Sequence, residues 1–360
     1  MITKLGIENF KDLNTLKIKN LNQVTLMSGK NNIGKTSILE AIILLLNNNQ
    51  SSAIVPFLAN REIKDFSVNR LYNEGIEFET AVSGIFCNHS LSKKISITSD
   101  DRTLEISIND ATPYKSDGYN SVTDSLELTY FINNIKVNYT SLKGSDGKYK
   151  ANISKWKPDS VSTFLINEHG GLDSITNKFN NSSKSNVVDL FDSIRKNPQE
   201  NLKDKLIQGL KLLDKTIEDV EIGINQISKE PQIELSRSTS KPVPLSSFGH
   251  GMKRFFNIIL ATVCAKNGVL LIDEIENGIH YSVLGEMWTL IFELAKLNNC
   301  QIIATTHSWE FASYVTNQSP ENQKLFSFIN IARLKNGELS SATYDYQKFN
   351  YAMNQDIEVR

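Results

Sequence analysis

The sequence predicts an α/β fold in which a parallel sheet with both faces covered carries an added antiparallel β subdomain and a helical lobe. Three observations predict this fold. A short apolar run at residues 24–27 leads through a glycine-rich loop into a segment with helical periodicity. Residues from about 75 to 153 alternate polar and apolar side chains with a period of two, as antiparallel strands do. Strand-like and helix-like segments alternate over the last third of the chain.

The N-terminal part is expected to combine one strand–loop–helix unit with the β subdomain. Residues Val24–Met27 predict a buried strand. The helix after the loop is indicated by apolar residues at helical spacing, namely Ile38, Leu39, Ile42, Ile43 and Leu46, and it should end in the polar stretch 47–52. Period-two segments at 77–82, 94–98 and 104–108 predict strands, and turn-prone clusters between them indicate antiparallel pairing.

The middle of the chain changes to helical periodicity between about 171 and 216, which predicts a helical lobe of modest size. The apolar residues that define its helices are Val187, Val188, Leu190, Phe191 and Ile194, followed by Leu202, Leu206, Leu210 and Leu213. Strands are expected again at 219–227 and 233–236. A proline-rich link at Lys241–Pro244 should separate this lobe from the last third.

The last third predicts alternating helices and buried strands. One apolar helix stripe consists of Met252, Phe255, Phe256, Ile259, Leu260 and Val263, and a second of Leu284, Met287, Trp288, Ile291 and Ala295. Buried strands are expected at 269–272 and 301–305, and Asn336-Gly337 predicts a hairpin turn. We therefore divide the chain into an N-terminal lobe (1–153), a helical lobe with connecting strands (154–244) and a C-terminal lobe (245–360).

The composition is that of a large soluble protein of 360 residues. Its 39 Lys and Arg offset 40 Asp and Glu, which excludes a broadly basic protein and leaves room for a local basic patch. Three sparse cysteines form no metal-ligand pair and favour a reducing compartment. The N-terminus lacks the apolar stretch of a signal peptide, and no apolar run reaches membrane-spanning length, so we expect a cytoplasmic protein without a membrane partner.

Residues Gly29–Thr36 read Gly-Lys-Asn-Asn-Ile-Gly-Lys-Thr, the G-x-x-x-x-G-K-[ST] spacing of a phosphate-binding loop. The order strand, loop, helix places exposed N–H groups and a helix N-terminus against the phosphates. Lys35 adds a point charge, and the Thr36 hydroxyl can reach Mg²⁺. The residues expected to bind the nucleotide here are Gly29, Asn31, Asn32, Gly34, Lys35, Thr36 and Ser37.

Two further strand ends carry residues suited to phosphoryl transfer. The strand at 269–272 ends in Asp273, which can hold Mg²⁺ beside Thr36, and in Glu274, which can orient the attacking water. A solvated strand end is the alternative for this acid pair taken alone. His307 follows the next buried strand and can donate a hydrogen bond to a γ-phosphate. Lys35, Glu274 and His307 are therefore the expected catalytic residues.

A serine- and glycine-rich segment, residues 245–254, opens the first helix of the last third. It predicts a second anion site from a hydroxyl and free N–H groups, with Ser247, Gly249 and Gly251 as contacts. A simple helix start capped by Ser246 or Ser247 is an equal alternative. Residues 276–280, just after the acid pair, could contact an opposite subunit, and His280 could equally be a packing residue.

Taken in order, these motifs resemble the ABC-type ATPase superfamily, whose members carry a Walker A loop, a signature motif, a Walker B strand, a D-loop and a switch histidine. The matching positions are Gly29–Thr36, Ser247–Gly251, Leu270–Glu274, Asn277–His280 and His307. The opening Ile7–Lys11 also resembles the chromosome-maintenance and recombination branch, in which the basic residue reaches the nucleotide; this implies a nucleotide contact for Lys11. The resemblance implies ATP and Mg²⁺ as cofactors and a homodimer or higher homo-oligomer.

Within that branch, the motifs are most similar to the ATPase domain of OLD-family and related phage-defence ATPases of the PARIS and Septu type. Two departures stand out. OLD proteins carry a C-terminal Toprim nuclease domain, whereas 53 residues follow His307 here without a Glu…Asp-x-Asp cluster, so we expect no nuclease activity in this chain. The segment 60–69, where the glutamine of the Q-loop is expected, contains no Gln.

The leading hypothesis is a cytoplasmic ABC-type ATPase in which ATP lies between Lys35 of one subunit and Ser247 of the other. By resemblance, its cycle would gate a separately encoded nuclease or toxin in anti-phage defence. One alternative is a DNA-repair or chromosome-maintenance ATPase that binds DNA directly. Another is a regulatory scaffold that uses ATP as a structural ligand.

Overall fold

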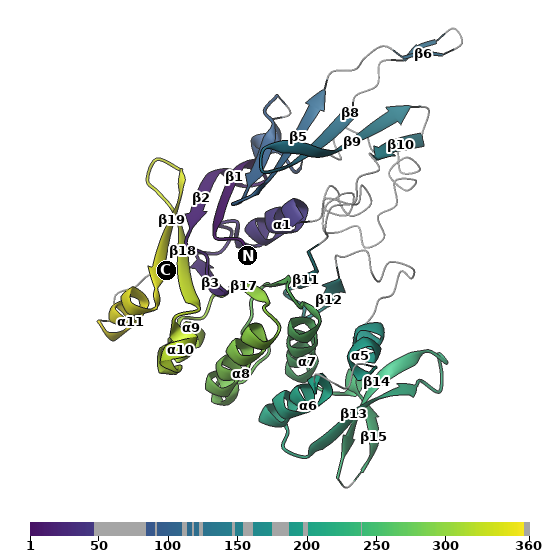
Figure 1. The fold of residues 1–360 in the computed structure, drawn as a ribbon, viewed down its shortest axis with the longest axis vertical. Helices are drawn as coiled ribbons and strands as arrows, with labels where there is room; N and C mark the ends of the chain where they lie inside the picture. Colours follow the sequence, from purple (N-terminus) through teal and green to yellow (C-terminus); the bar gives the residue numbers. More distant parts are fainter. Residues whose placement is uncertain are drawn as a thin grey trace.

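The computed structural model describes residues 1–46, 84–90, 92–109, 114–116, 119–121, 125–145, 148–153, 161–174, 187–196, 201–238 and 240–355 (Figure 1). Three predictions lie outside these residues: the polar helix end at 47–52, the strand at 77–82 and the missing glutamine at 60–69. None of the helices that the structure describes is long and apolar enough to cross a membrane.

A seven-stranded sheet forms the centre of the protein, and its inner strands are parallel. The order is β12 (Leu172–Ser174), β11 (Thr163–Ile166), β16 (Val269–Ile272), β17 (Gln301–Thr305), β3 (Val24–Gly29), β18 (Phe326–Arg333) and β19 (Leu339–Asp345). The edge strands β12 and β19 pair antiparallel with β11 and β18. The predicted strands and the hairpin at Asn336-Gly337 are confirmed. Because β11, β16, β17, β3 and β18 are parallel, their carboxyl ends lie along one edge.

The second seven-stranded sheet is antiparallel throughout and confirms the predicted β subdomain. Its order is β10 (Lys148–Ile153), β9 (Ile135–Ser145), β8 (Ser125–Ile132), β5 (Arg102–Asn109), β4 (Ile95–Thr98), β1 (Lys4–Phe10) and β2 (Leu13–Lys19). A separate pair is formed by β6 (Tyr114–Ser116) and β7 (Tyr119–Ser121). The first two strands of the chain thus belong to this sheet, although they precede the phosphate-binding loop.

Helices cover both faces of the parallel sheet. The helix α1 (Lys35–Leu46) lies between the two large sheets, and the other face carries α7 (His250–Cys264), α8 (Leu284–Leu297), α9 (Trp309–Ser313), α10 (Pro320–Gln323) and α11 (Tyr346–Asn354) (Figure 1). Alternate residues of β3 therefore enter two cores: Leu26 packs with the α7–α8 side and Met27 with the α1 side. Covering both faces explains why the inner strands are apolar without interruption.

The helical lobe consists of α5 (Val187–Arg195), α6 (Leu202–Leu213) and a three-stranded antiparallel sheet of β13 (Ile217–Ile224), β14 (Pro231–Arg237) and β15 (Ser240–Pro244). The prediction of a link at Lys241–Pro244 is wrong, because these residues form β15. Proline donates no ladder hydrogen bond, but β15 is an edge strand, where this is tolerated. Strands β11 and β12 lie in the central sheet although the predicted division places them with the helical lobe; that division stays a prediction.

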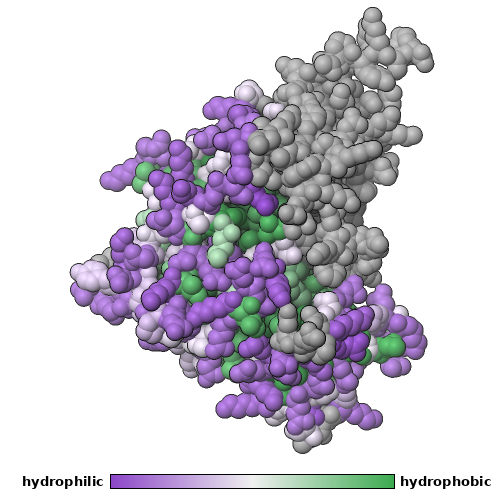
Figure 2. All heavy atoms as spheres, in the orientation of Figure 1, coloured by the Kyte–Doolittle hydropathy of each residue, from purple (hydrophilic) through white to green (hydrophobic). Residues whose placement is uncertain are grey.

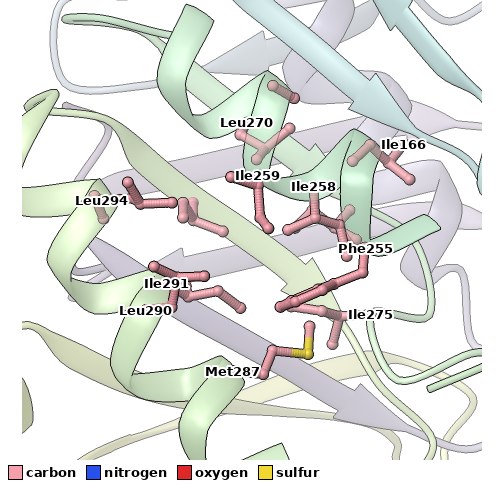
Figure 3. Packing of buried hydrophobic residues seen from close by; sticks show 14 of the residues in the cluster. Ile166, Phe255, Ile258, Ile259, Leu270, Ile275, Met287, Leu290, Ile291 and Leu294 are labelled. Atoms are coloured by element: carbon pink, nitrogen blue, oxygen red, sulfur yellow. The ribbon is translucent and has the colours of Figure 1, made fainter. Parts of the chain in front are cut away.

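The packing between α7 and α8 fixes the last third onto the sheet. Figure 3 shows Phe255, Ile258 and Ile259 of α7 facing Met287, Leu290 and Ile291 of α8, in the same cluster as Leu270 of β16. Of these helix residues, Phe255, Ile259, Met287 and Ile291 belong to the apolar stripes that the sequence predicted as core, whereas Ile258 and Leu290 do not. On the outside, hydrophilic residues cover most of the described surface in Figure 2.

We expect Trp288 to be a major determinant of stability. Its buried ring lies 4.8 Å from that of Phe311 and 6.2 Å from that of Phe326, and Nε1 donates to the Phe311 carbonyl at 3.1 Å. Trp288→Ala should lower the free energy of unfolding by about 3–5 kcal/mol, measured by urea unfolding. Leu297→Ala, on the same helix but 53% exposed, should change it by less than about 0.5 kcal/mol. Equal midpoints for the two variants would contradict the core assignment.

Candidate nucleotide site

A polar cavity of about 560 Å³ lies where the carboxyl ends of the parallel strands meet the start of α1. Its lining comes from the loop after β3, from α1, and from the residues that follow β11, β16 and β17. All of the residues predicted for the phosphate loop except Gly29 line it, as do Lys11, Asp273, Glu274 and His307. The structure therefore brings together residues that lie up to 296 positions apart in the chain, from Lys11 to His307.

The phosphate-binding loop turns sharply into α1 at Gly34. Its φ is +97°, and an added Cβ would lie 2.7 Å from Leu13 Cδ2, so only glycine fits. The helix begins at Lys35, whose buried ammonium donates to the carbonyls of Gly29 at 2.7 Å and Lys30 at 3.1 Å. Burial lowers the pKa of Lys35, although the nearby carboxylates of Asp273, Glu274 and Glu276 oppose this. The ammonium is thus held inside the loop, at the N-terminus of a helix that favours anions.

Two oxygen atoms suited to a hard divalent cation lie beside each other at the mouth of α1. Thr36 Oγ1 donates to Asp273 Oδ2 at 2.8 Å, and Thr305 Oγ1 donates to Asp273 Oδ1 at 2.6 Å. Asp273 is buried, and these two hydroxyls fix its carboxylate. A hydroxyl and a carboxylate fit Mg²⁺, which takes few protein ligands and completes its shell with water and phosphate oxygens. Thr36 and Asp273 are therefore the residues that could hold this metal.

Glu274 is held in a backbone conformation that side chains rarely adopt. Its φ is +53°, and its amide donates to Thr305 Oγ1 at 2.8 Å. Its carboxylate lines the cavity and lies 3.6 Å from His307 Nε2. A strained backbone conformation persists where the surrounding structure enforces it, often at a functional site. Thr305 thus orients both predicted acids at once, a role that the strand pattern at 301–305 did not indicate.

His307 stands between the phosphate loop and the acid pair. Its Nδ1 lies 3.5 Å from Lys35 Nζ. Its backbone amide and that of Ser308 donate to Glu276 Oε1 at 2.8 and 3.1 Å. Glu276 therefore fixes the segment that carries His307.

Arg254 is the functional-site residue that sequence reasoning missed most clearly. The side chain is fully buried on α7 and donates only to backbone carbonyls among the described residues. Its acceptors are Asn167 at 2.9 Å, Glu168 at 3.2 Å, Glu274 at 2.7 Å and Asp273. Burial lowers its pKa, whereas the carboxylates of Glu276, Asp273 and Glu274 raise it. The guanidinium thus joins the ends of β11 and β16 to α7. A charged residue inside a helix otherwise rich in apolar residues was the available signal.

The end of β11 adds a second residue that was not predicted. Glu168 lines the cavity, and its carbonyl accepts from Asn277 Nδ2 at 3.1 Å. The loop after β11 is also bound by α7, since His250 Nε2 lies 2.8 Å from the His169 carbonyl and Asn257 Nδ2 donates to the Gly170 carbonyl at 2.9 Å. The sequence analysis did not identify β11 (Thr163–Ile166) as a strand, so the residues that follow it were not considered.

The segment with Ser247, Gly249 and Gly251 lies outside the lining of this cavity. The N-cap of α7 is Gly249, without a side-chain hydrogen bond, so the alternative of a cap by Ser246 or Ser247 is wrong. Ser247 is exposed in the 3-10 turn Leu245–Ser247. Gly251 packs on the predicted D-loop: an added Cβ would lie 2.1 Å from the Gly278 carbonyl oxygen. The two motifs that are expected to face another subunit are therefore in contact with each other.

Lys11 and His280 are the two predicted contacts that remain. Lys11 lines the cavity, and its Nζ forms an ion pair with Glu40 Oε2 at 2.6 Å. His280 is exposed, with its ring 4.2 Å from that of Tyr281 and Nδ1 2.9 Å from the Ser282 hydroxyl. Its neighbours are thus local residues of the same turn. The roles predicted for Lys11 and His280 stay predictions.

Comparison with known proteins shows the family and the fold. An ATP/GTP phosphatase of Helicobacter pylori is 24% identical over 338 residues, which cover 86% of each chain. The Smc head bound to the C-winged helix domain of ScpA is similar in structure, with a TM-score of 0.52 at 13% identity over 96% of this chain and 99% of that one. An Smc head domain bound to the C-terminal domain of ScpA from Pyrococcus furiosus gives a TM-score of 0.51 at 11% identity, with 99% of both chains covered.

The two structural likenesses show that the fold resembles that of Smc head domains. The family model described as AAA ATPase domain (AAA_15) matches residues 1–312, most of the chain. The protein therefore belongs to the AAA ATPase domain family and is an ATPase.

Proposed function

We propose that the chain binds ATP in the cavity at the start of α1 and hydrolyses it there with Lys35, Glu274 and His307. Lys35 would donate from within the loop to the β- and γ-phosphates, where the α1 N-terminus also favours negative charge. Glu274 would orient the attacking water and accept its proton, and His307 would donate to the γ-phosphate. Thr36 and Asp273 would hold Mg²⁺, which would supply charge neutralisation at the phosphates. The remaining loop contacts would be Asn31, Asn32 and Ser37, with Lys11 at the margin.

We also propose that two copies of the chain complete each other's sites. The observation that carries this is the position of Ser247: it is exposed and lies outside the cavity, at the start of a helix bound to the Asp273 and Glu274 carbonyls. A serine hydroxyl with free N–H groups at the start of a 15-residue helix suits a phosphate from a facing subunit. Ser247, Gly249 and Gly251 would then contact the γ-phosphate across a homodimer interface, beside Asn277 and His280.

The proposed output of this cycle is the gating of a separately encoded nuclease or toxin in anti-phage defence. The motif resemblance to OLD-type defence ATPases supports it. Both Smc heads are bound to a domain of ScpA, which supports control of a partner protein more generally. A chromosome-maintenance role with direct DNA binding remains the second candidate, since Smc heads share the fold. An ATP-stabilised scaffold is the third candidate, and measured turnover would argue against it. We propose a cytoplasmic location.

Glu274→Gln should retain ATP binding and reduce turnover by about 10² or more, because the amide keeps the shape but accepts no proton. Glu276→Gln is the matched control, since its amide oxygen can still accept from His307 and Ser308. We expect it to lose less than about tenfold. Phosphate release and ATP titration are measured for both variants. A larger loss in Glu276→Gln than in Glu274→Gln would transfer the role of base to Glu276.

Lys35→Ala should lose most ATP binding, and Ser247→Arg should bind ATP without turning it over. Mixing the two chains should restore part of the activity, because a mixed dimer has one site with an intact Lys35 and an intact facing Ser247. The measurement is phosphate release after subunit exchange, followed in parallel by an energy-transfer signal between labelled chains. Exchange without recovered turnover would exclude the shared site.

Effector gating predicts a phenotype that needs both genes. Cells that carry the chain with its neighbouring reading frame should resist phage, whereas either gene alone should not. Glu274→Gln should abolish the response in these cells, and Lys203→Met, a variant in the helical lobe, should not. Plaque counts provide the readout. Protection by the chain alone, or undiminished protection by Glu274→Gln, would overturn the gating proposal.

A further inference from the structure

The turn that carries Ser247 is attached to the small sheet of the helical lobe. Strand β15 ends at Pro244, and the 3-10 turn Leu245–Ser247 follows at once. The last residues of β15 are paired with β14, Pro244 opposite Glu234 and Val243 opposite Leu235. We call residues 245–249 the signature turn. Its position is set at one end by the small sheet and at the other by α7.

A second attachment crosses from β14 to the turn itself. The guanidinium of Arg237, the last residue of β14, lies over the ring of Phe248, 4.9 Å from its centroid. Phe248 stands between Ser247 and Gly249, and its partly buried ring packs against the larger hydrophobic core. A cation over a half-buried aromatic face contributes on the order of 0.5–2 kcal/mol. Movement of Ser247 or Gly249 would displace this ring.

Arg237 is itself fixed by a carboxylate at the end of α6. Its Nε and Nη2 donate to Asp214 Oδ2 at 3.1 and 2.7 Å. Asp214 is held in turn by the hydroxyl and the amide of Thr216, at 2.6 and 3.0 Å. Hydrogen bonds from Thr216 and the nearby Arg237 keep the pKa of Asp214 below its ordinary value, so the carboxylate stays charged. The planar guanidinium can bind the carboxylate with its edge and the ring with its face.

We propose that Arg237 is a positioning residue for the signature turn. The contacts from Asp214 to Arg237 and from Arg237 to Phe248 hold Ser247 and Gly249 in the position where they would contact the γ-phosphate of the facing subunit. The inference rests on the shared site proposed above. It assigns to the small β13–β15 sheet the role of a support for the second half of the site, and it makes the helical lobe part of the catalytic assembly.

The first test compares Arg237→Met with Lys203→Met. Methionine keeps the length of the side chain but removes the charge and the planar group. Lys203 forms an ion pair with Asp219 at 2.6 Å in the same lobe and serves as the matched control. Arg237→Met should lower kcat about tenfold and leave the ATP Kd of the isolated chain within about twofold, whereas Lys203→Met should change neither. A normal kcat in Arg237→Met would overturn the proposal.

The second test asks in which subunit Arg237 acts. Arg237→Met mixed with Lys35→Ala should give turnover several-fold above the mean of the separate samples, because one composite site is intact. Arg237→Met mixed with Ser247→Arg should show no such gain, since both changes damage the same half-site. A general loss of folding would give no gain in either mixture and would overturn the proposal. Arg237→Lys, which keeps the charge without the planar stack, should recover only part of the kcat.

The reference mixture of Lys35→Ala with Ser247→Arg tests the shared site by itself and so distinguishes a failure of the shared site from a failure of the role proposed for Arg237. If it recovers turnover and the Arg237→Met mixture does not, the positioning role alone is wrong. If the reference mixture stays inactive while the subunits exchange, the shared site fails, and the role of Arg237 fails with it.

Discussion

The buried guanidinium of Arg254 is the interaction on which the geometry of the site depends. It binds four backbone carbonyls, two at the end of β11 and two at the end of β16. A buried charge is costly unless hydrogen bonds and opposite charges compensate for it, and the carboxylates of Glu276, Asp273 and Glu274 lie close enough to do so. The strand ends, the acid pair and α7 can therefore move only as a unit. This unit connects the nucleotide cavity to the surface that carries Ser247.

The parallel arrangement of the inner strands explains why a few side chains are enough to form the site. Each inner strand delivers its following residue to the same edge, and hydrogen bonds from Thr36 and Thr305 then orient Asp273. Thr305 also receives the amide of Glu274, which supports the left-handed backbone at that residue. Phosphoryl transfer depends mainly on position and on charge neutralisation. Because the strand ends belong to a close-packed sheet, they fix the positions of the reacting side chains, and no separate loop is needed for each of these side chains.

Local patterns predicted most of the fold and the motifs, because these signals lie within a few residues of one another. The phosphate loop, the acid pair and the apolar stripes of α7 and α8 are of this kind. The contacts of Arg254 could not be predicted, since its partners lie 19 to 87 residues away and are backbone atoms without a sequence signature. Glu168 was missed because the strand before it, β11, was not identified in the sequence. Strand β15 was interpreted as a link because prolines are rare inside strands. An edge strand tolerates them, since it forms hydrogen bonds with a neighbour on one side only.

The charges around the cavity define what the site can accept. Among the described residues, its lining includes the acids Asp12, Glu40, Glu168, Asp273 and Glu274 but only the lysines Lys11 and Lys35, and Lys11 is paired with Glu40. A triphosphate without a bound metal is negatively charged, and so is most of this lining, so the two would repel each other. A divalent cation between Thr36 and Asp273 would reverse that balance, since it would be the largest local charge in the site. The same acids that repel a bare triphosphate would then favour its metal complex, which ties nucleotide recognition in this chain to the oxygen pair at the start of α1.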